Sequence, residues 1–167
     1  MCKLPNLVVL TSGVGVGSSK LNAYDSALLN SNIGNFNLVQ VSSIIPPKAK
    51  VYYYEECKDI ILNYTHGLII PVVYTSIISE KKGETIASAL GAGVPIDESK
   101  NGVIFETSLV GSEQVARENV SFMINEAMLN RNIKHYSLLL ISAEAKVKST
   151  IMCTLCAAIL LETNLGT

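Results

Sequence analysis

Residues 35–47, NFNLVQVSSIIPP, begin as a β-strand and end in two prolines. Over residues 37–43 successive side chains alternate between two faces, as they do in a strand. The two prolines have no backbone N–H to give to a sheet, so the strand must stop before them. The tandem serine Ser42-Ser43 therefore lies where a strand meets rigid residues, a position that can hold backbone strain for a functional purpose. From these residues alone, an ordinary loop before a proline turn is the simpler interpretation.

The rest of the chain alternates predicted strands with predicted helices. We expect further strands at 7–10, 51–54, 67–78, 102–107 and 136–142, and helices at 21–32, 55–64, 112–132 and 148–162. Residues 83–91 fit a helix or a strand, and a strand is favoured because they follow a turn and are rich in small residues. The glycine- and serine-rich segment 12–19 is interpreted as a flexible connection. This alternation predicts a single α/β domain spanning 1–167.

The composition indicates a folded protein with more apolar residues than is usual for a soluble chain of this length. Hydrophobic residues make up 49% of the chain and charged residues 16%, and the mean hydropathy is +0.35. A large subunit interface would use this surplus, because obligate interfaces resemble a protein core cut in half. The net charge of −1, from 13 basic and 14 acidic residues, gives no sign of a nucleic-acid surface.

Export and membrane insertion are not expected from the sequence. The N-terminus lacks the long apolar stretch of a signal peptide, and the longest apolar-rich segment, 151–161, is too short to span a bilayer. We therefore expect a cytoplasmic protein with reduced cysteines and no membrane partner.

Three other motifs fail on spacing or context. A glycine-rich segment after a strand invites a phosphate-binding interpretation, but Lys20 follows two serines, and Ser18 stands where the dinucleotide fingerprint needs glycine. Cys153 and Cys156 form a C-x-x-C pair inside the predicted last helix, with no second pair at zinc spacing, so core packing is the better interpretation and no metal is expected. The two histidines are isolated, and no nucleophile-elbow sequence supports a Ser-His-Asp triad.

The motif VSSIIPP at 41–47, preceded by IGNFNL at 33–38, resembles the processing site of the pyruvoyl-dependent arginine decarboxylase family. The resemblance covers most of the chain and is tightest over 21–47. It implies a four-layer α/β/β/α sandwich that assembles as a homotrimer, with active sites between subunits.

In that family the chain cuts itself between the two serines, and the chemistry requires a serine. The Ser43 hydroxyl attacks the carbonyl of Ser42, and the amide becomes an ester. Loss of the α-proton of Ser43 expels the Ser42 carboxylate and leaves dehydroalanine, whose hydrolysis gives a ketone. The resemblance thus implies a small chain, 1–42, and a large chain, 43–167, which starts with a self-made pyruvoyl cofactor.

The implied reaction is the decarboxylation of L-arginine to agmatine and CO2. The pyruvoyl ketone can form a Schiff base with the substrate amine and take up electrons as CO2 leaves, as pyridoxal phosphate does in other enzymes. Two alternatives stay open: decarboxylation of another amino acid, such as histidine or aspartate, and a non-catalytic trimer that never processes.

Three further residues receive roles from the resemblance. Glu106 ends the pattern Gly-x-Ile-x-Glu at 102–106 and matches the family's proton donor to the substrate Cα; burial would keep such a carboxyl protonated near neutral pH. Asn37 matches an asparagine that assists processing, and Asp25 matches an aspartate that contacts the substrate guanidinium. From the residues alone, Glu106 and Asn37 are polar ends of strands, and Asp25 is a charge on a helix surface.

Overall fold

Residues 4–163 are described by the computed structural model, and they form nine strands and three helices. In chain order these are β1 (Leu7–Gly17), α1 (Lys20–Asn30), β2 (Asn37–Gln40), β3 (Ile44–Ile45), β4 (Lys50–Tyr53), α2 (Tyr54–Ile61), β5 (Ile69–Ser79), β6 (Thr85–Pro95), β7 (Gly102–Val110), α3 (Glu113–Asn130), β8 (Tyr136–Lys146) and β9 (Ile151–Leu161). Apart from the last predicted helix, every predicted helix and strand is present, with shifted ends. No helix among the described residues is long and apolar enough to cross a bilayer.

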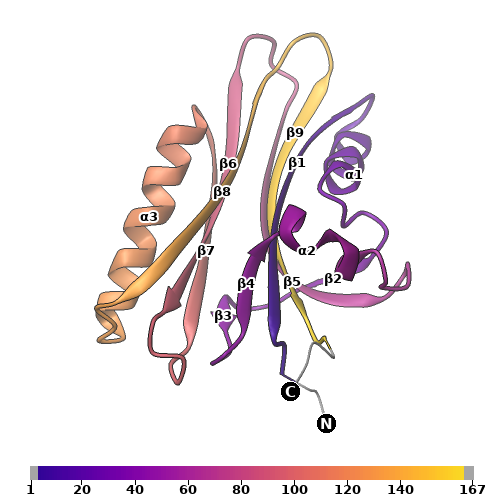
Figure 1. Cartoon of the computed structure of the whole chain (residues 1–167). Helices are drawn as coiled ribbons and strands as arrows, with labels where there is room; N and C mark the ends of the chain where they lie inside the picture. Colours follow the sequence, from indigo (N-terminus) through magenta and orange to yellow (C-terminus); the bar gives the residue numbers. More distant parts are fainter. Residues whose placement is uncertain (1–3, 164–167) are drawn as a thin grey trace.

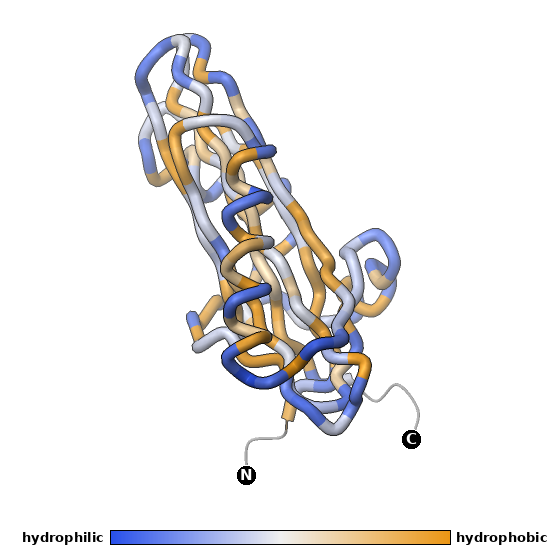
Figure 2. Tube along the Cα trace, turned by 90° about the vertical axis from the view of Figure 1, so that its left-hand side faces the viewer, coloured by the Kyte–Doolittle hydropathy of each residue, from blue (hydrophilic) through white to orange (hydrophobic). Residues whose placement is uncertain are grey.

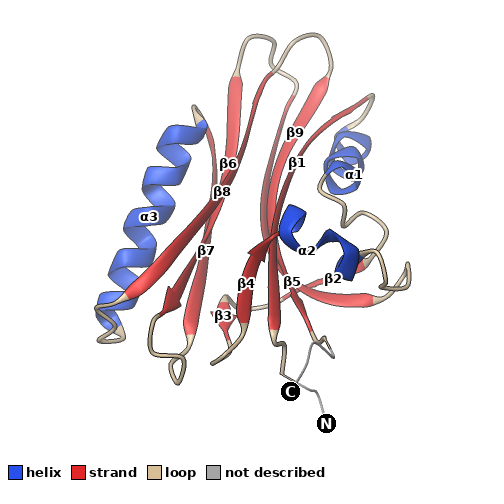
Figure 3. Cartoon of the chain, in the orientation of Figure 1, coloured by secondary structure: helices blue, strands red, loops and turns tan. Residues whose placement is uncertain are grey.

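The strands form two sheets that face each other (Figure 3). The first sheet has the order β2-β5-β9-β1-β4, and the second has the order β3-β7-β6-β8. The first sheet is mixed, because β1–β4 and β2–β5 are parallel pairs whereas β9 is antiparallel to both β1 and β5. The second sheet is antiparallel. Helices α1 and α2 lie outside the first sheet, and α3 lies outside the second (Figure 1). The chain is thus a single α/β domain in which both sheets have a helix-covered outer face.

Apolar side chains fill the spaces between these elements. Between the two sheets the buried residues include Leu10, Val73 and Leu90. Helix α3 is amphipathic, with Val120 and Ile124 buried against the second sheet, and Figure 2 shows its turns alternating between hydrophobic and hydrophilic colours. This pattern explains why 112–132 is correctly predicted as a helix.

The glycine-rich segment 12–19 is not a flexible connection, because β1 extends through it to Gly17. Its glycines at 13, 15 and 17 lie on one face of the strand, against the backbone of α1. A Cβ at Gly15 would collide with the carbonyl oxygen of Ala23 and the backbone nitrogen of Ala27. The glycines are therefore needed for the close approach of helix and strand.

Gly15→Ala is expected to destabilise the fold far more than Gly91→Ala. The new methyl group at 15 would meet helix backbone, whereas at 91 it would meet only side-chain atoms, of Ile124, Leu140 and Val120, and the ends of the first two can move. Overpacking of this kind costs about 1–3 kcal/mol or more, so we expect about 3 kcal/mol or above at Gly15 and about 1 kcal/mol at Gly91. Urea unfolding of the two variants measures the difference, and equal losses would contradict the packing of α1 on β1.

The predicted last helix, 148–162, is wrong, because these residues form strand β9. Strand β9 lies inside the first sheet, between β1 and β5, and every residue from Cys153 to Leu161 is buried. A strand buried on both faces shows no alternation of polar and apolar residues, so its sequence resembles that of a buried helix. Cys153 and Cys156 consequently pack in a strand, in the cores on opposite faces of the sheet.

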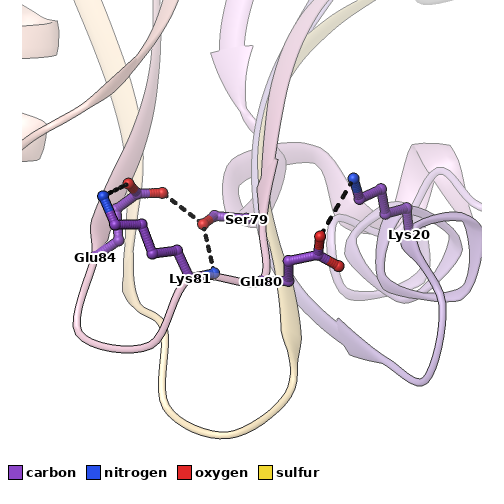
Figure 4. Close-up of polar contacts among 5 residues, drawn as sticks. All are labelled: Lys20, Ser79, Glu80, Lys81 and Glu84. Atoms are coloured by element: carbon purple, nitrogen blue, oxygen red, sulfur yellow. Dashed lines mark hydrogen bonds and ion pairs between the residues drawn. The ribbon is translucent and has the colours of Figure 1, made fainter.

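The connection between β5 and β6 carries the chain from the first sheet to the second. Ser79 Oγ donates to Glu84 Oε2 over 2.5 Å and accepts from the backbone N–H of Lys81 over 3.1 Å. Glu80 reaches Lys20, at the start of α1, over 3.7 Å (Figure 4). Ser79 and Glu84 therefore fix the two ends of this connection against each other. The exposed ion pair of Glu80 and Lys20 adds little to the stability of the fold.

Candidate active site

Ser42 and Ser43 lie where the chain crosses from one sheet to the other. Strand β2 pairs with β5 of the first sheet, and β3 pairs with β7 of the second, so the residues between them bridge the two sheets (Figure 1). The strand predicted over 37–43 therefore ends early, at Gln40. Ser42 is exposed, and Ser43 is half-buried.

Backbone hydrogen bonds hold this crossing on both sides. The N–H of Val41 donates to the carbonyl of Val72 in β5 over 3.0 Å. The carbonyl of Ser43 accepts from the N–H of Ile104 in β7 over 2.9 Å. The peptide bond between the two serines thus lies between a residue that is hydrogen-bonded to the first sheet and a residue that is hydrogen-bonded to the second.

A third hydrogen bond lies within the crossing itself. The carbonyl oxygen of Ser42 accepts from the backbone N–H of Ile44 over 3.0 Å, which closes a turn centred on Ser43. The carbonyl that a Ser43 hydroxyl would attack is therefore polarised by a donor two residues along the chain.

Glu106 lies on β7, two residues beyond the strand position that holds Ser43. Because side chains alternate along a strand, Glu106 shares a face with Ile104, which is buried between the two sheets. Glu106 pairs with Leu90 of β6, and burial raises the pKa of its carboxyl group. Within residues 4–163 we find no hydrogen bond or ion pair to this carboxylate, so it can receive a ligand.

Beyond Glu106 the same face of β7 carries a polar group that the sequence analysis did not assign. Ser108 Oγ lies 2.8 Å from Thr75 Oγ1 of β5 and 2.8 Å from Ser88 Oγ of β6. Ser88 Oγ in turn lies 2.8 Å from Thr154 Oγ1 of β9. This cluster of four hydroxyls links the two sheets, two residues further along β7 than Glu106. No local sequence signal predicts this cluster, because its members come from four separate strands.

Asn37 is the first residue of β2, and it is exposed. Its side-chain Nδ2 donates to the carbonyl of Gly67 over 2.6 Å, and its backbone N–H donates to the carbonyl of Leu68 over 2.9 Å. Asn37 thereby fixes the start of β2 to the turn that precedes β5, one short strand before the two serines.

Asp25 is exposed on α1, which covers the outer face of the first sheet. Glu106 belongs to the second sheet, on the face that looks toward the first. One chain therefore brings Ser43 and Glu106 together through the β3–β7 pairing, while its own first sheet separates Asp25 from Glu106.

A cavity of about 330 Å³ opens beside the segment that follows the serines. Ile45, Pro46 and Lys48 are among its lining residues, but Ser43 and Glu106 are not. Within a single chain, the cavity is thus separate from the candidate site. Among the described residues no group of three or more His, Cys, Asp or Glu is placed to hold a metal ion.

An α/β domain with a serine pair suspended between its sheets and a half-buried, unpaired carboxylate on the adjoining strand has the features of an enzyme. The model of the family described as pyruvoyl-dependent arginine decarboxylase matches residues 7–164 of this chain. The chain belongs to this family, whose name implies a covalently bound pyruvoyl group.

Individual relatives agree with the family match. A protein from Methanococcus vannielii is 35% identical over 93% of this chain and 90% of its own length. A protein from Pyrococcus furiosus is 37% identical, over 86% of this chain and 87% of its own. One from Methanocaldococcus jannaschii is 40% identical over 72% and 69%. Each is named pyruvoyl-dependent arginine decarboxylase.

Proposed function

We propose that this protein is a self-processing, pyruvoyl-dependent decarboxylase that converts L-arginine to agmatine and CO2. The observation that carries the proposal is the Ser42–Ser43 peptide, held between two sheets with Glu106 on the strand that anchors Ser43. Membership of the family and the names of the relatives support the same reaction.

Self-cleavage between the two serines fits the way the crossing is anchored. A cut there separates 1–42 from 43–167, and each new end keeps a partner in a sheet: Val41 on β5, and residue 43 on β7. Neither product has to unfold for the linkage to break. The exposure of Ser42 leaves room for its carboxylate to depart.

The residues around position 43 suit a pyruvoyl group made from Ser43. Such a group supplies a ketone for covalent attachment of a substrate amine and an acceptor for the electrons released with CO2. The Ile104 N–H would hold the adjoining carbonyl, and Glu106 would deliver a proton to the substrate Cα. Burial raises the pKa of Glu106 and so keeps it protonated closer to neutral pH. Asn37 would assist processing by fixing β2 before the cut.

We further propose a four-layer α/β/β/α sandwich that assembles as a trimer, with active sites between subunits. Strand β3 covers the edge of β7 only near Gly102 and Val103, and β2 covers the edge of β5 only up to Val72. The remaining edges of β5 and β7 are half-exposed and lie beside Glu106. Unpaired strand edges invite another chain, and a second copy could supply the Asp25 that one chain keeps away from Glu106.

The three described cysteines, at 57, 153 and 156, are buried and free, which suits a cytoplasmic enzyme. Incubation of the purified protein with L-arginine, histidine and aspartate tests the reaction. We expect agmatine and CO2 from arginine and no CO2 from the other two. Release from histidine or aspartate instead would give the protein another substrate, and no release from a fully processed sample would make it a non-catalytic family member.

Asp25→Asn is expected to weaken arginine binding and to leave cleavage at Ser43 intact. A carboxylate accepts the planar fork of a guanidinium through two parallel hydrogen bonds, which the amine of ornithine cannot match. The ratio of kcat/KM for arginine to that for ornithine should therefore fall in the variant.

Glu126→Gln provides the matched control, because Glu126 is an exposed acid on α3, outside the other sheet. Its kcat/KM ratio should equal that of the wild type. Should Asp25→Asn also leave the ratio unchanged, Asp25 is only a surface charge, and the preference for arginine has another origin.

A further inference from the structure

The carbonyl oxygen of Ser42 has a hydrogen-bond donor in place before any reaction. The backbone N–H of Ile44 donates to it over 3.0 Å, from two residues along the chain. Ser43, between them, has a negative φ, since within residues 4–163 the residues other than glycine with positive φ are Asn32, Lys48 and Asn132. The crossing is therefore an inverse γ-turn with Ser43 at its centre.

The pairing of β3 with β7 explains why the N–H of Ile44 is available to the carbonyl of Ser42. Ser43 accepts a hydrogen bond from Ile104, and Ile44 stands opposite Val103. In an antiparallel ladder, hydrogen-bonded and non-bonded pairs alternate, so Ile44 occupies a non-bonded position. Its N–H points away from β7, and the Ser42 carbonyl is its acceptor.

Two other donors near the linkage are already used. The Val41 N–H donates to Val72, and the Asn37 side-chain nitrogen donates to Gly67. The donor aimed at the oxygen of Ser42 is thus the backbone N–H of Ile44.

We propose that the backbone N–H of Ile44 stabilises the oxyanion that forms on Ser42 during self-cleavage. The inference rests on the proposed self-cleavage. When the Ser43 Oγ bonds to the carbonyl carbon of Ser42, the π pair moves onto the carbonyl oxygen, and the hydroxyl proton passes to water. Collapse of this adduct breaks the C–N bond, the nitrogen of Ser43 takes up a proton, and an ester remains. The Ile44 hydrogen bond strengthens as charge develops on the oxygen, which is the requirement for transition-state stabilisation.

Replacement of the amide bond before residue 44 by an ester removes this N–H and keeps the isoleucine side chain. Loss of one oxyanion donor slows comparable reactions by about 10²–10³-fold, so we expect cleavage between Ser42 and Ser43 to slow by about that factor. The ester also makes the α-proton of Ser43 more acidic, which favours the later elimination, so any slowing belongs to the first step.

Two further esters serve as matched controls. An ester before Val41 removes an N–H whose hydrogen bond has the same length, 3.0 Å, but which does not touch the scissile carbonyl. An ester before Ile104 removes the donor to the Ser43 carbonyl, a contact that the ester at 44 also weakens by changing that carbonyl. Both controls should slow cleavage much less than the ester at 44.

Ile44→Pro removes the same N–H by ordinary mutagenesis, and proline is tolerated at a strand position that gives no ladder hydrogen bond. It should cut as slowly as the ester at 44, and circular dichroism establishes that the variants are folded. Mass spectrometry follows each bond separately, so hydrolysis of an introduced ester is counted apart from the cut at Ser42–Ser43.

Cleavage of both Ile44 variants at the wild-type rate, or an equal slowing in the two control esters, would overturn the role of Ile44. These outcomes differ from failure of self-cleavage itself. In that case the wild-type chain would also stay whole, and both proposals would fall together.

Discussion

Ser43→Ala is expected to remain a single, uncut chain, because it lacks the hydroxyl that attacks the carbonyl of Ser42. The backbone contacts that hold the crossing, from residue 41 to β5 and from residue 43 to β7, do not involve this hydroxyl. The variant should therefore fold like the wild type while cleavage is abolished. Denaturing electrophoresis after prolonged incubation at neutral pH is sufficient to see the difference.

Ser42→Ala is the matched control, one residue away and with the same loss of a hydroxyl. Ser42 contributes only its carbonyl to the proposed step, and its side chain is exposed. We expect this variant to cut at a rate close to that of the wild type. Cleavage of Ser43→Ala, or a block of cleavage in Ser42→Ala alone, would show that Ser43 is not the nucleophile.

Glu106→Gln is expected to process normally and to lose most of its turnover, since help from a general acid is typically worth about 10²–10⁴-fold. Glutamine keeps the size of the side chain, but its amide protons are too weakly acidic to be donated to carbon. In the wild type, burial raises the pKa of Glu106. Turnover should therefore be full below that raised pKa and fall as the pH rises through it, because the carboxyl group then loses its proton.

The control for this experiment is Glu126→Gln, a change of the same kind at an exposed position on α3. It should keep the turnover and the pH profile of the wild type. A near-normal kcat in fully processed Glu106→Gln, with the fall at high pH still present, would remove Glu106 from the mechanism.

Local sequence signals predict the elements that have one polar and one apolar face. Helix α3 has a serine cap at Ser112 and a buried stripe, and both are visible in the sequence. Strand β9 has neither an exposed face nor a charge to mark its period, which is why a helix was expected there. Segment 12–19 differs from its prediction for another reason: its glycines make room for the backbone of α1, and composition does not reveal this contact between elements.

The candidate site was predictable as a set of residues but not as an arrangement. The serine pair before two prolines and the glutamate of the Gly-x-Ile-x-Glu pattern could be picked out from the sequence and its resemblance, although Glu106 lies in the middle of β7 and not at the expected strand end. The bond from Ile104 to Ser43 depends on the register of β3 against β7, across nearly sixty positions of the chain, and no local pattern encodes it. The separation of Asp25 from Glu106 likewise depends on which sheet each element joins.

Intact-mass spectrometry of the purified, denatured protein shows directly whether the chain cuts itself between Ser42 and Ser43. We expect two chains that together cover 1–167, with a break between Ser42 and Ser43 and a large chain whose N-terminus has no free amine. A single chain of full mass, unchanged after prolonged incubation at neutral pH, would contradict self-cleavage.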